Sequence, residues 1–115
     1  MDRRKELQMQ YKNMKPDMGV YMIRPKTEKR AFIEASANLK GKINRLTFTL
    51  GMNLHPNQAL QQDWSTYGED GIEIVILEKL EYDKDETKED YSAELELLLE
   101  IWKERLEAEG YTWYT

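Results

Sequence analysis

Seven basic residues lie between positions 24 and 45, with Tyr21 shortly before them and His55, the only histidine of the chain, downstream. Lysine and arginine side chains bind the phosphate groups of nucleic acids. The spacing therefore predicts a basic surface for phosphate near the tyrosine and the histidine. No motif that would read bases accompanies these residues, so we expect phosphates to carry any binding. The seven residues are Arg24, Lys26, Lys29, Arg30, Lys40, Lys42 and Arg45.

The charge of the chain is divided unevenly along its length. Residues 1–55 contain twelve Lys and Arg and five Asp and Glu, whereas residues 56–115 contain five and seventeen, and the net charge is −5. A protein polarised in this way can bind DNA through its basic N-terminal half while it remains acidic overall. An acidic helix on an ordinary protein surface explains the same numbers, and charge alone leaves both readings open.

Composition limits the other kinds of site that the chain could contain. The sequence has no cysteine, which excludes disulfides and metal sites built from thiolates. Its 115 residues predict a single domain. The longest apolar run, residues 74–77, is too short to span a bilayer, and the charged residues after Met1 do not lead into the apolar core of a signal peptide. We therefore expect a cytoplasmic protein with no membrane partner.

The pattern of apolar residues predicts three strands that would position these groups. Residues 19–24 and 30–35 are rich in β-forming side chains and are separated by a short polar turn, which is typical of a hairpin. Residues 72–79 first alternate and then become wholly apolar, as expected for a central strand that is covered on both faces. The expected sheet therefore has three strands, with 72–79 inside it.

Four helices are predicted around these strands. Helical spacing of apolar residues marks 3–14, a stretch beginning near Leu39 that Ser36 or Asn38 can cap, a stretch from the N-cap Asn57 to Gly68, and a long amphipathic helix over 87–109. The fold class is therefore α/β, a small three-stranded sheet flanked by helices in the order α-β-β-α-α-β-α. Residues 1–16 form a helical extension of a single domain whose core is 18–115.

Three segments carry a resemblance to a known family. Residues 19–21, Gly-Val-Tyr, open the first strand, and residues 32–36, Phe-Ile-Glu-Ala-Ser, lie on the second. From His55 the chain runs through a leucine-glutamine pair, a tryptophan and a tyrosine-glycine pair to the third strand, ending at residue 78. In this order the segments resemble the GIY-YIG nucleases over about residues 18–115. The fold that the resemblance implies agrees with the order of elements predicted without it.

The resemblance implies metal-assisted hydrolysis of phosphodiester bonds, in which a tyrosine helps to prepare water and an arginine holds the phosphate. Tyr21 matches the tyrosine of the first motif. Phe32 stands where the second motif has a tyrosine, and Glu34 stands where it has a glycine. Lys42 replaces the arginine and keeps the charge without the bidentate fork. These departures put efficient cleavage in doubt.

The resemblance also implies a divalent cation, usually Mg²⁺, held by a glutamate of the last helix. Leu99 occupies the matching position, and Glu96 and Glu100 lie nearby on other faces of the predicted helix. Glu96 is therefore the candidate metal ligand. His55 is a candidate phosphate contact, since some members of the family place a histidine in this region.

Each candidate also has a purely structural interpretation. A tyrosine in a strand, such as Tyr21, commonly packs in a half-buried position. His55 precedes a helix start and has no visible partner in the sequence, which is typical of an exposed capping residue. The aromatic residues at the C-terminus could stack on bases, or they could fold back on the core.

Three functions remain open from the sequence. The first is a degenerate GIY-YIG-like domain that binds nucleic acid and cuts it weakly or not at all. The second is an active metal-dependent endonuclease with a rearranged site, in which Glu34 or Glu96 binds the metal and Lys42 replaces the arginine. The third is a scaffold that binds another protein. Convergence of the seven basic residues on one concave face with Tyr21 and His55 would favour nucleic acid, and scatter would favour the scaffold.

Overall fold

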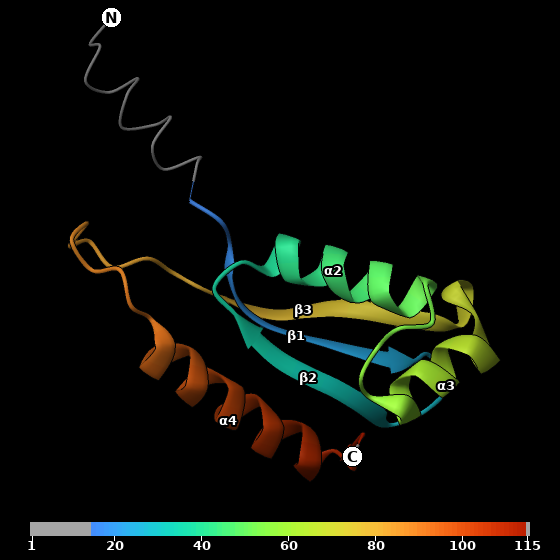
Figure 1. Cartoon of the computed structure of the whole chain (residues 1–115). Helices are drawn as coiled ribbons and strands as arrows, with labels where there is room; N and C mark the ends of the chain where they lie inside the picture. Colours follow the sequence, from blue (N-terminus) through green and yellow to red (C-terminus); the bar gives the residue numbers. More distant parts are fainter. Residues whose placement is uncertain (1–14, 115) are drawn as a thin grey trace, which may run out of the picture.

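The computed structural model describes residues 15–114, which form an α/β domain with helices on both faces of a mixed four-stranded sheet (Figure 1). The N-terminal helix expected over 3–14 lies outside the described residues. In chain order the elements are β1 (Met18–Pro25), β2 (Arg30–Ser36), α2 (Leu39–Gly51), α3 (Gln58–Tyr67), the 3₁₀ turn η1 (Glu69–Gly71), β3 (Ile72–Leu80), α4 (Ser92–Ala108) and β4 (Thr112–Trp113). No helix in this part of the chain is long and apolar enough to cross a membrane.

The predicted hairpin is confirmed, but the expected position of the third strand is wrong. The strands are ordered β3-β1-β2-β4, so β1 is central and β3 lies at an edge of the sheet. Residues Met18 to Ile23 of β1 are all buried, whereas Ile76 of β3 is 44% exposed. A run of apolar residues shows that the side chains of a strand are apolar. It does not show whether another strand pairs with each of its two edges.

A bulge in β3 adjusts its pairing with β1. Val20 pairs with Glu78 and Tyr21 with Ile76, so Leu77 is the extra residue. A bulge changes the face to which the following side chains point. Glu78 consequently reaches α4, where its Oε1 accepts a hydrogen bond of 3.0 Å from the indole N–H of Trp102.

The sheet separates two layers of helix (Figure 1). On one face, buried residues of β1 and β3 pack with α2 and α3 in a cluster that includes Tyr21, Ile23, Leu46 and Leu60. On the other face, Met22 and Ala31 pack with Leu106 of α4, and the partly buried Trp102 joins them. The expected contact of the long helix with the sheet is confirmed. Trp102 is half-buried rather than fully buried, so its removal should cost less than the loss of a core aromatic residue.

The two short helices have the caps that the sequence predicted. The Asn38 side chain accepts a hydrogen bond from the backbone N–H of Gly41, and that of Asn57 accepts one from Leu60. Gly68 ends α3 with φ of 75°, a conformation in which glycine avoids the strain that a side chain would bring.

The start of the long helix differs from the prediction. The helix begins at Ser92 rather than Thr87, because Thr87 forms a local turn in which Asp85 accepts hydrogen bonds from its N–H and hydroxyl. Asp90 then accepts a hydrogen bond of 2.9 Å from the N–H of Ser92. Local side-chain hydrogen bonds of this kind compete with helix formation.

The C-terminal residues fold back on the core, as one of the two readings predicted. Residues Thr112–Trp113 form β4, which pairs in parallel with the start of β2 and adds the fourth strand. The Tyr114 hydroxyl donates a hydrogen bond of 2.6 Å to Asp63, which also accepts one of 2.5 Å from Arg30. Burial opposes ionisation of Asp63, but hydrogen bonds from Arg30 and Tyr114 lower its pKa below the usual value.

Candidate functional site

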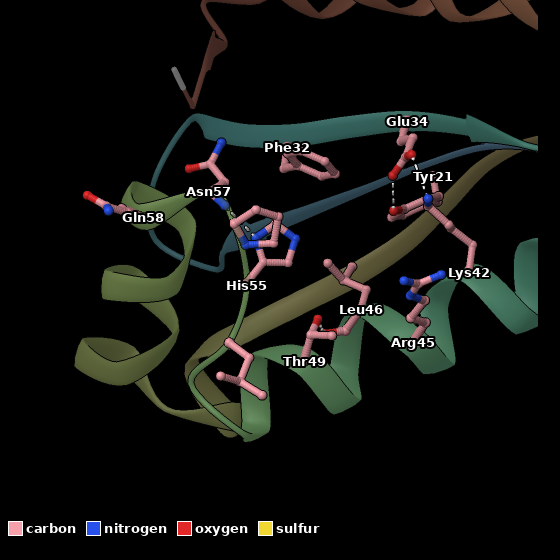
Figure 2. Close-up of a pocket in the computed structure, with 12 residues that line it drawn as sticks. Tyr21, Phe32, Glu34, Lys42, Arg45, Leu46, Thr49, His55, Asn57 and Gln58 are labelled. Atoms are coloured by element: carbon pink, nitrogen blue, oxygen red, sulfur yellow. Dashed lines mark hydrogen bonds and ion pairs between the residues drawn. The ribbon is translucent and has the colours of Figure 1, made fainter.

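A pocket of about 870 Å³ opens between the sheet, α2 and the loop that leads into α3 (Figure 2). The two strands of the hairpin form its floor, and α2 forms one wall. All five candidate catalytic residues from the sequence line this pocket, although they are spread over 34 positions of the chain. They are Tyr21, Phe32, Glu34, Lys42 and His55.

The tyrosine of the first motif lies at the bottom of the pocket. Tyr21 is on the central strand and has no exposed surface. Gly19, two residues earlier, lets β1 approach β3 closely, since a Cβ at this position would lie 2.0 Å from the backbone oxygen of Glu78. The glycine and the tyrosine of the motif therefore have separate roles, one in strand pairing and one in the pocket.

A carboxylate of the pocket is bound by two neighbouring side chains. The Tyr21 hydroxyl donates a hydrogen bond of 2.7 Å to Oε2 of Glu34, and the Lys42 ammonium lies 3.1 Å from Oε1 (Figure 2). The side chains of Lys42 and Glu34 keep 44% and 31% of their surfaces exposed, so solvent screens this ion pair. Glu34 and Lys42 thus cover the buried phenol, and the pocket contains an anion of its own.

This arrangement keeps the Tyr21 phenol protonated. Burial raises the pKa of Tyr21 well above its ordinary value, and the hydrogen bond to the Glu34 carboxylate raises it further. A phenolate at this position would be desolvated and would face a second negative charge. Tyr21 can therefore donate a hydrogen bond at neutral pH.

Replacing Tyr21 with phenylalanine should lower stability at neutral pH and reduce the loss of stability in alkali. The substitution removes a hydrogen bond to a charged acceptor, worth about 1.5–3 kcal/mol. In the native protein the raised pKa favours the protonated folded state, so stability should fall as the pH rises above about 10, where unfolded tyrosine ionises. Urea unfolding at pH 7 and at several pH values above 9 measures both effects.

Tyr114 should also contribute to the loss of stability in alkali. Its pKa is also raised, first by burial and then by its bond to Asp63, so the Tyr21→Phe variant should retain part of the alkaline loss. The double variant Tyr21→Phe, Tyr114→Phe should lose still less. An unchanged alkaline profile in Tyr21→Phe would contradict the buried hydrogen bond between Tyr21 and Glu34.

Phe32 and His55 meet at the other end of the pocket. Their rings are 5.8 Å apart at an angle of 85°, an edge-to-face contact. The imidazole Nδ1 atom of His55 accepts a hydrogen bond of 3.0 Å from the backbone N–H of Asn57. The backbone N–H of His55 donates a hydrogen bond to the side-chain oxygen of Gln61. His55 is therefore held by the start of α3 and lines the pocket; it is partly buried rather than exposed, and its contact with phosphate stays a prediction.

The seven basic residues do not converge on one face with Tyr21 and His55, and this outcome taken alone favours the protein-binding scaffold over nucleic acid. Of the seven, Lys42 and Arg45 line the pocket. Arg24 pairs with Glu73 at 2.7 Å, and Arg30 pairs with Asp63 at 2.5 Å; neither arginine lines the pocket. Lys29 donates to the backbone oxygen of Glu109, and Lys26 and Lys40 are likewise exposed residues outside the pocket lining.

The pocket lining offers one carboxylate to a Mg²⁺ ion. Glu34 is the carboxylate of the pocket lining, and it already binds Tyr21 and Lys42. Glu96 is exposed on α4, which covers the opposite face of the sheet, and Leu99 offers no oxygen. Within residues 15–114 no three histidine, aspartate or glutamate side chains are grouped so that they could hold a metal ion. Mg²⁺ keeps several of its waters and is commonly bound through one or two carboxylates, so at this pocket it would have to compete with Tyr21 and Lys42 for Glu34.

Several pocket residues were not candidates from the sequence. Thr49 and Leu46 line the α2 wall, and Leu54 and Gln58 line the side near α3. Leu46 could have been found, because its helical spacing from Leu39 and Ile43 places it on the face of α2 that meets the sheet. The others are single polar or apolar residues at the ends of helices, where no periodic pattern marks them.

Two solved structures resemble this fold. The catalytic domain of the homing endonuclease I-TevI matches with a TM-score of 0.61 and 20% identity, over 78% of this chain and 88% of that chain. A glutamate-to-alanine mutant of the catalytic domain of the intron endonuclease I-TevI matches with a TM-score of 0.56 and 21% identity, over 79% of this chain and 84% of that chain. No protein-family model matches the sequence, and a search of curated proteins gives no match. The described chain thus has a GIY-YIG-like fold, that of a nuclease catalytic domain.

Proposed function

We propose that this chain is a nuclease-like domain that binds nucleic acid weakly through phosphates and cuts it poorly or not at all. The nuclease-like fold and the two cations of the pocket lining, Lys42 and Arg45, support contact with phosphate. The position of Glu34 supports weak binding and poor cleavage, because its carboxylate accepts a hydrogen bond from the Tyr21 hydroxyl and pairs with Lys42 inside the pocket. A phosphate placed against Lys42 would have to displace this carboxylate or lie beside it. The internal anion therefore opposes tight binding of an external one.

The same residues oppose catalysis. Phe32 has no hydroxyl that could relay a proton, and the Tyr21 phenol is protonated and buried. Lys42 offers a point charge rather than the paired donors of a guanidinium. The remaining cation of the lining is Arg45, which is exposed on the α2 wall and could contact a phosphate at the rim.

An active endonuclease with a rearranged site is the alternative function. Glu34 is the residue that supports it, because its carboxylate lies at the bottom of the pocket beside the Tyr21 hydroxyl. In that case Glu34 would act directly on water or on a cation, and its pairing with Lys42 would have to open. Cleavage assays separate this function from the first.

We expect weak binding of double-stranded DNA that depends on salt and little on sequence. Non-specific binding of this kind has a dissociation constant of about 10⁻⁴ to 10⁻⁶ M at physiological salt. With Lys42 and Arg45 as the two phosphate contacts, affinity should fall about tenfold between 50 and 200 mM salt. Fluorescence anisotropy with two unrelated duplexes and one single strand measures both properties.

Arg45→Ala provides the variant for this experiment, and Arg105→Ala, on the opposite face of the molecule, provides the matched control. Arg45→Ala should weaken binding and reduce the dependence of the binding constant on salt concentration by the contribution of about one phosphate contact. Arg105→Ala should change neither the affinity nor its salt dependence. Absence of binding at low ionic strength, or binding that is insensitive to salt, would refute the proposed phosphate contact.

A further inference from the structure

The exposed apolar side chains of the molecule gather in two places. Six large apolar residues are exposed within residues 15–114, and five of them belong to two groups. The first group, here called the α2 patch, consists of Phe48, Met52 and Leu54, which are 65%, 57% and 68% exposed. The second group, the α4 patch, consists of Leu97 and Ile101, which are 59% and 41% exposed. Grouped apolar surface is typical of a binding site.

The α2 patch has a basic surrounding. Phe48 and Met52 are one helical turn apart, and the backbone N–H of Leu54 donates to the oxygen of Thr49, which returns the chain to the end of α2. Helix α2 contains three basic residues and no acidic residue. Arg45, three residues before Phe48, is exposed, and Lys40 is exposed near the start of the helix. A partner with negative charges around an apolar surface would match this end of the molecule.

The α4 patch has the opposite character. Leu97 and Ile101 are four residues apart and therefore lie on the same face of the helix. Helix α4 contains five glutamates against one lysine and one arginine. Glu96, Glu100 and Glu104, which are near the two apolar residues in sequence, are all exposed, and they outnumber the exposed Arg105, four residues after Ile101.

We propose that the α2 patch of one copy of this chain binds the α4 patch of a second copy. Each patch provides what the other lacks, because one combines apolar side chains with positive charge and the other combines them with negative charge. A contact between two α2 patches would bring like charges together, as would a contact between two α4 patches, and both are disfavoured. The heterologous pairing is the one that buries both apolar groups beside opposite charges.

The position of the patches determines the kind of assembly. Helices α2 and α4 lie on opposite faces of the sheet (Figure 1), so a copy bound to one patch leaves the other patch free. A heterologous contact that does not close by rotation continues from copy to copy. The native protein should therefore form oligomers that grow beyond the dimer as concentration rises and that shrink as salt is added.

Two variants, each lacking one patch, test this proposal in sedimentation velocity experiments. Phe48→Ser with Met52→Ser removes the α2 patch, and Leu97→Ser with Ile101→Ser removes the α4 patch. Each double variant alone should be a monomer at concentrations where the native protein associates. Their equimolar mixture should form a dimer and nothing larger, since only one productive contact remains. Ile76→Ser, which removes the sixth exposed apolar residue, is the matched control and should associate like the native protein.

Other outcomes would overturn the proposal. A native protein that stays monomeric up to millimolar concentration has no such contact. Association that persists in one double variant alone would indicate pairing of like patches, and loss of association in Ile76→Ser would indicate pairing through the edge strand β3. Circular dichroism and thermal unfolding of each variant confirm that its fold is intact, which the exposure of the substituted side chains leads us to expect. Arg45 and Leu54 belong to the pocket lining as well as to this end of α2. Association is measured without nucleic acid, so its failure would leave the proposed function standing.

Discussion

Replacing Gly19 with alanine should lower the free energy of unfolding by about 3 kcal/mol, at the upper end of what overpacking usually costs. The added Cβ would lie 2.0 Å from the backbone oxygen of Glu78 and 2.8 Å from the Cα of Lys79. Both are backbone atoms, so no side chain can rotate away to make room. The central strand β1 would have to separate from β3, and the pairing that places Tyr21 in the pocket would be disturbed.

Gly51→Ala is the matched control for this prediction. A Cβ at Gly51 would meet no atom within 4 Å, and the residue ends helix α2. Alanine there should leave stability unchanged or raise it by roughly 0.5–1 kcal/mol. Urea denaturation of both variants measures the difference. A Gly19→Ala variant as stable as the native protein would show that β1 and β3 are not paired as closely as described.

Replacing Glu34 with glutamine should strengthen binding of DNA about tenfold at low salt, which is about 1.4 kcal/mol. The substitution removes the negative charge from the pocket and releases Lys42 from its ion pair. Glutamine keeps an oxygen that can accept the Tyr21 hydrogen bond, so the buried phenol retains a partner. Fluorescence anisotropy with one labelled duplex, at 50 and 200 mM salt, measures the change.

Glu96→Gln is the matched control for the change in charge. It removes the same charge from an exposed position on α4, on the other side of the sheet. Its affinity for DNA should stay close to that of the native protein, because exposed charges further apart than the Debye length are largely screened. Equal gains in both variants would mean that net charge alone governs binding, and the specific role of Glu34 would be refuted.

Local signals predicted most of the fold. Asn38, Asn57 and Gly68 mark helix ends through hydrogen bonds and backbone geometry that involve only neighbouring residues, and the structure has these ends where the sequence placed them. The predicted start of α4 was wrong because two local patterns overlap there. Thr87 forms a turn with Asp85, and the helix that was expected to begin at Thr87 begins at Ser92. The position of β3 was wrong because strand order depends on contacts that no local pattern records.

The sequence predicted several residues of the pocket, but it did not predict the hydrogen bonds and ion pairs that these residues form. Motif positions on two strands and one helix identified Tyr21, Glu34 and Lys42, and the structure brings these three side chains together. The ion pairs of Arg24 and Arg30 join residues 49 and 33 positions apart. Such pairs follow from the tertiary fold, and they hold Arg24 and Arg30 outside the pocket lining.

A cleavage assay tests the central claim most directly, namely that the pocket as arranged does not support phosphodiester hydrolysis. Native protein is incubated with plasmid and with single-stranded DNA in the presence of Mg²⁺ or Mn²⁺, beside the double variant Tyr21→Phe, Glu34→Gln. We predict no cutting above that of the double variant, because the lining has one carboxylate, already bound by Tyr21 and Lys42, and a phenylalanine at position 32. Robust cutting by the native protein that disappears in the double variant would contradict this account and establish Glu34 as part of a rearranged active site.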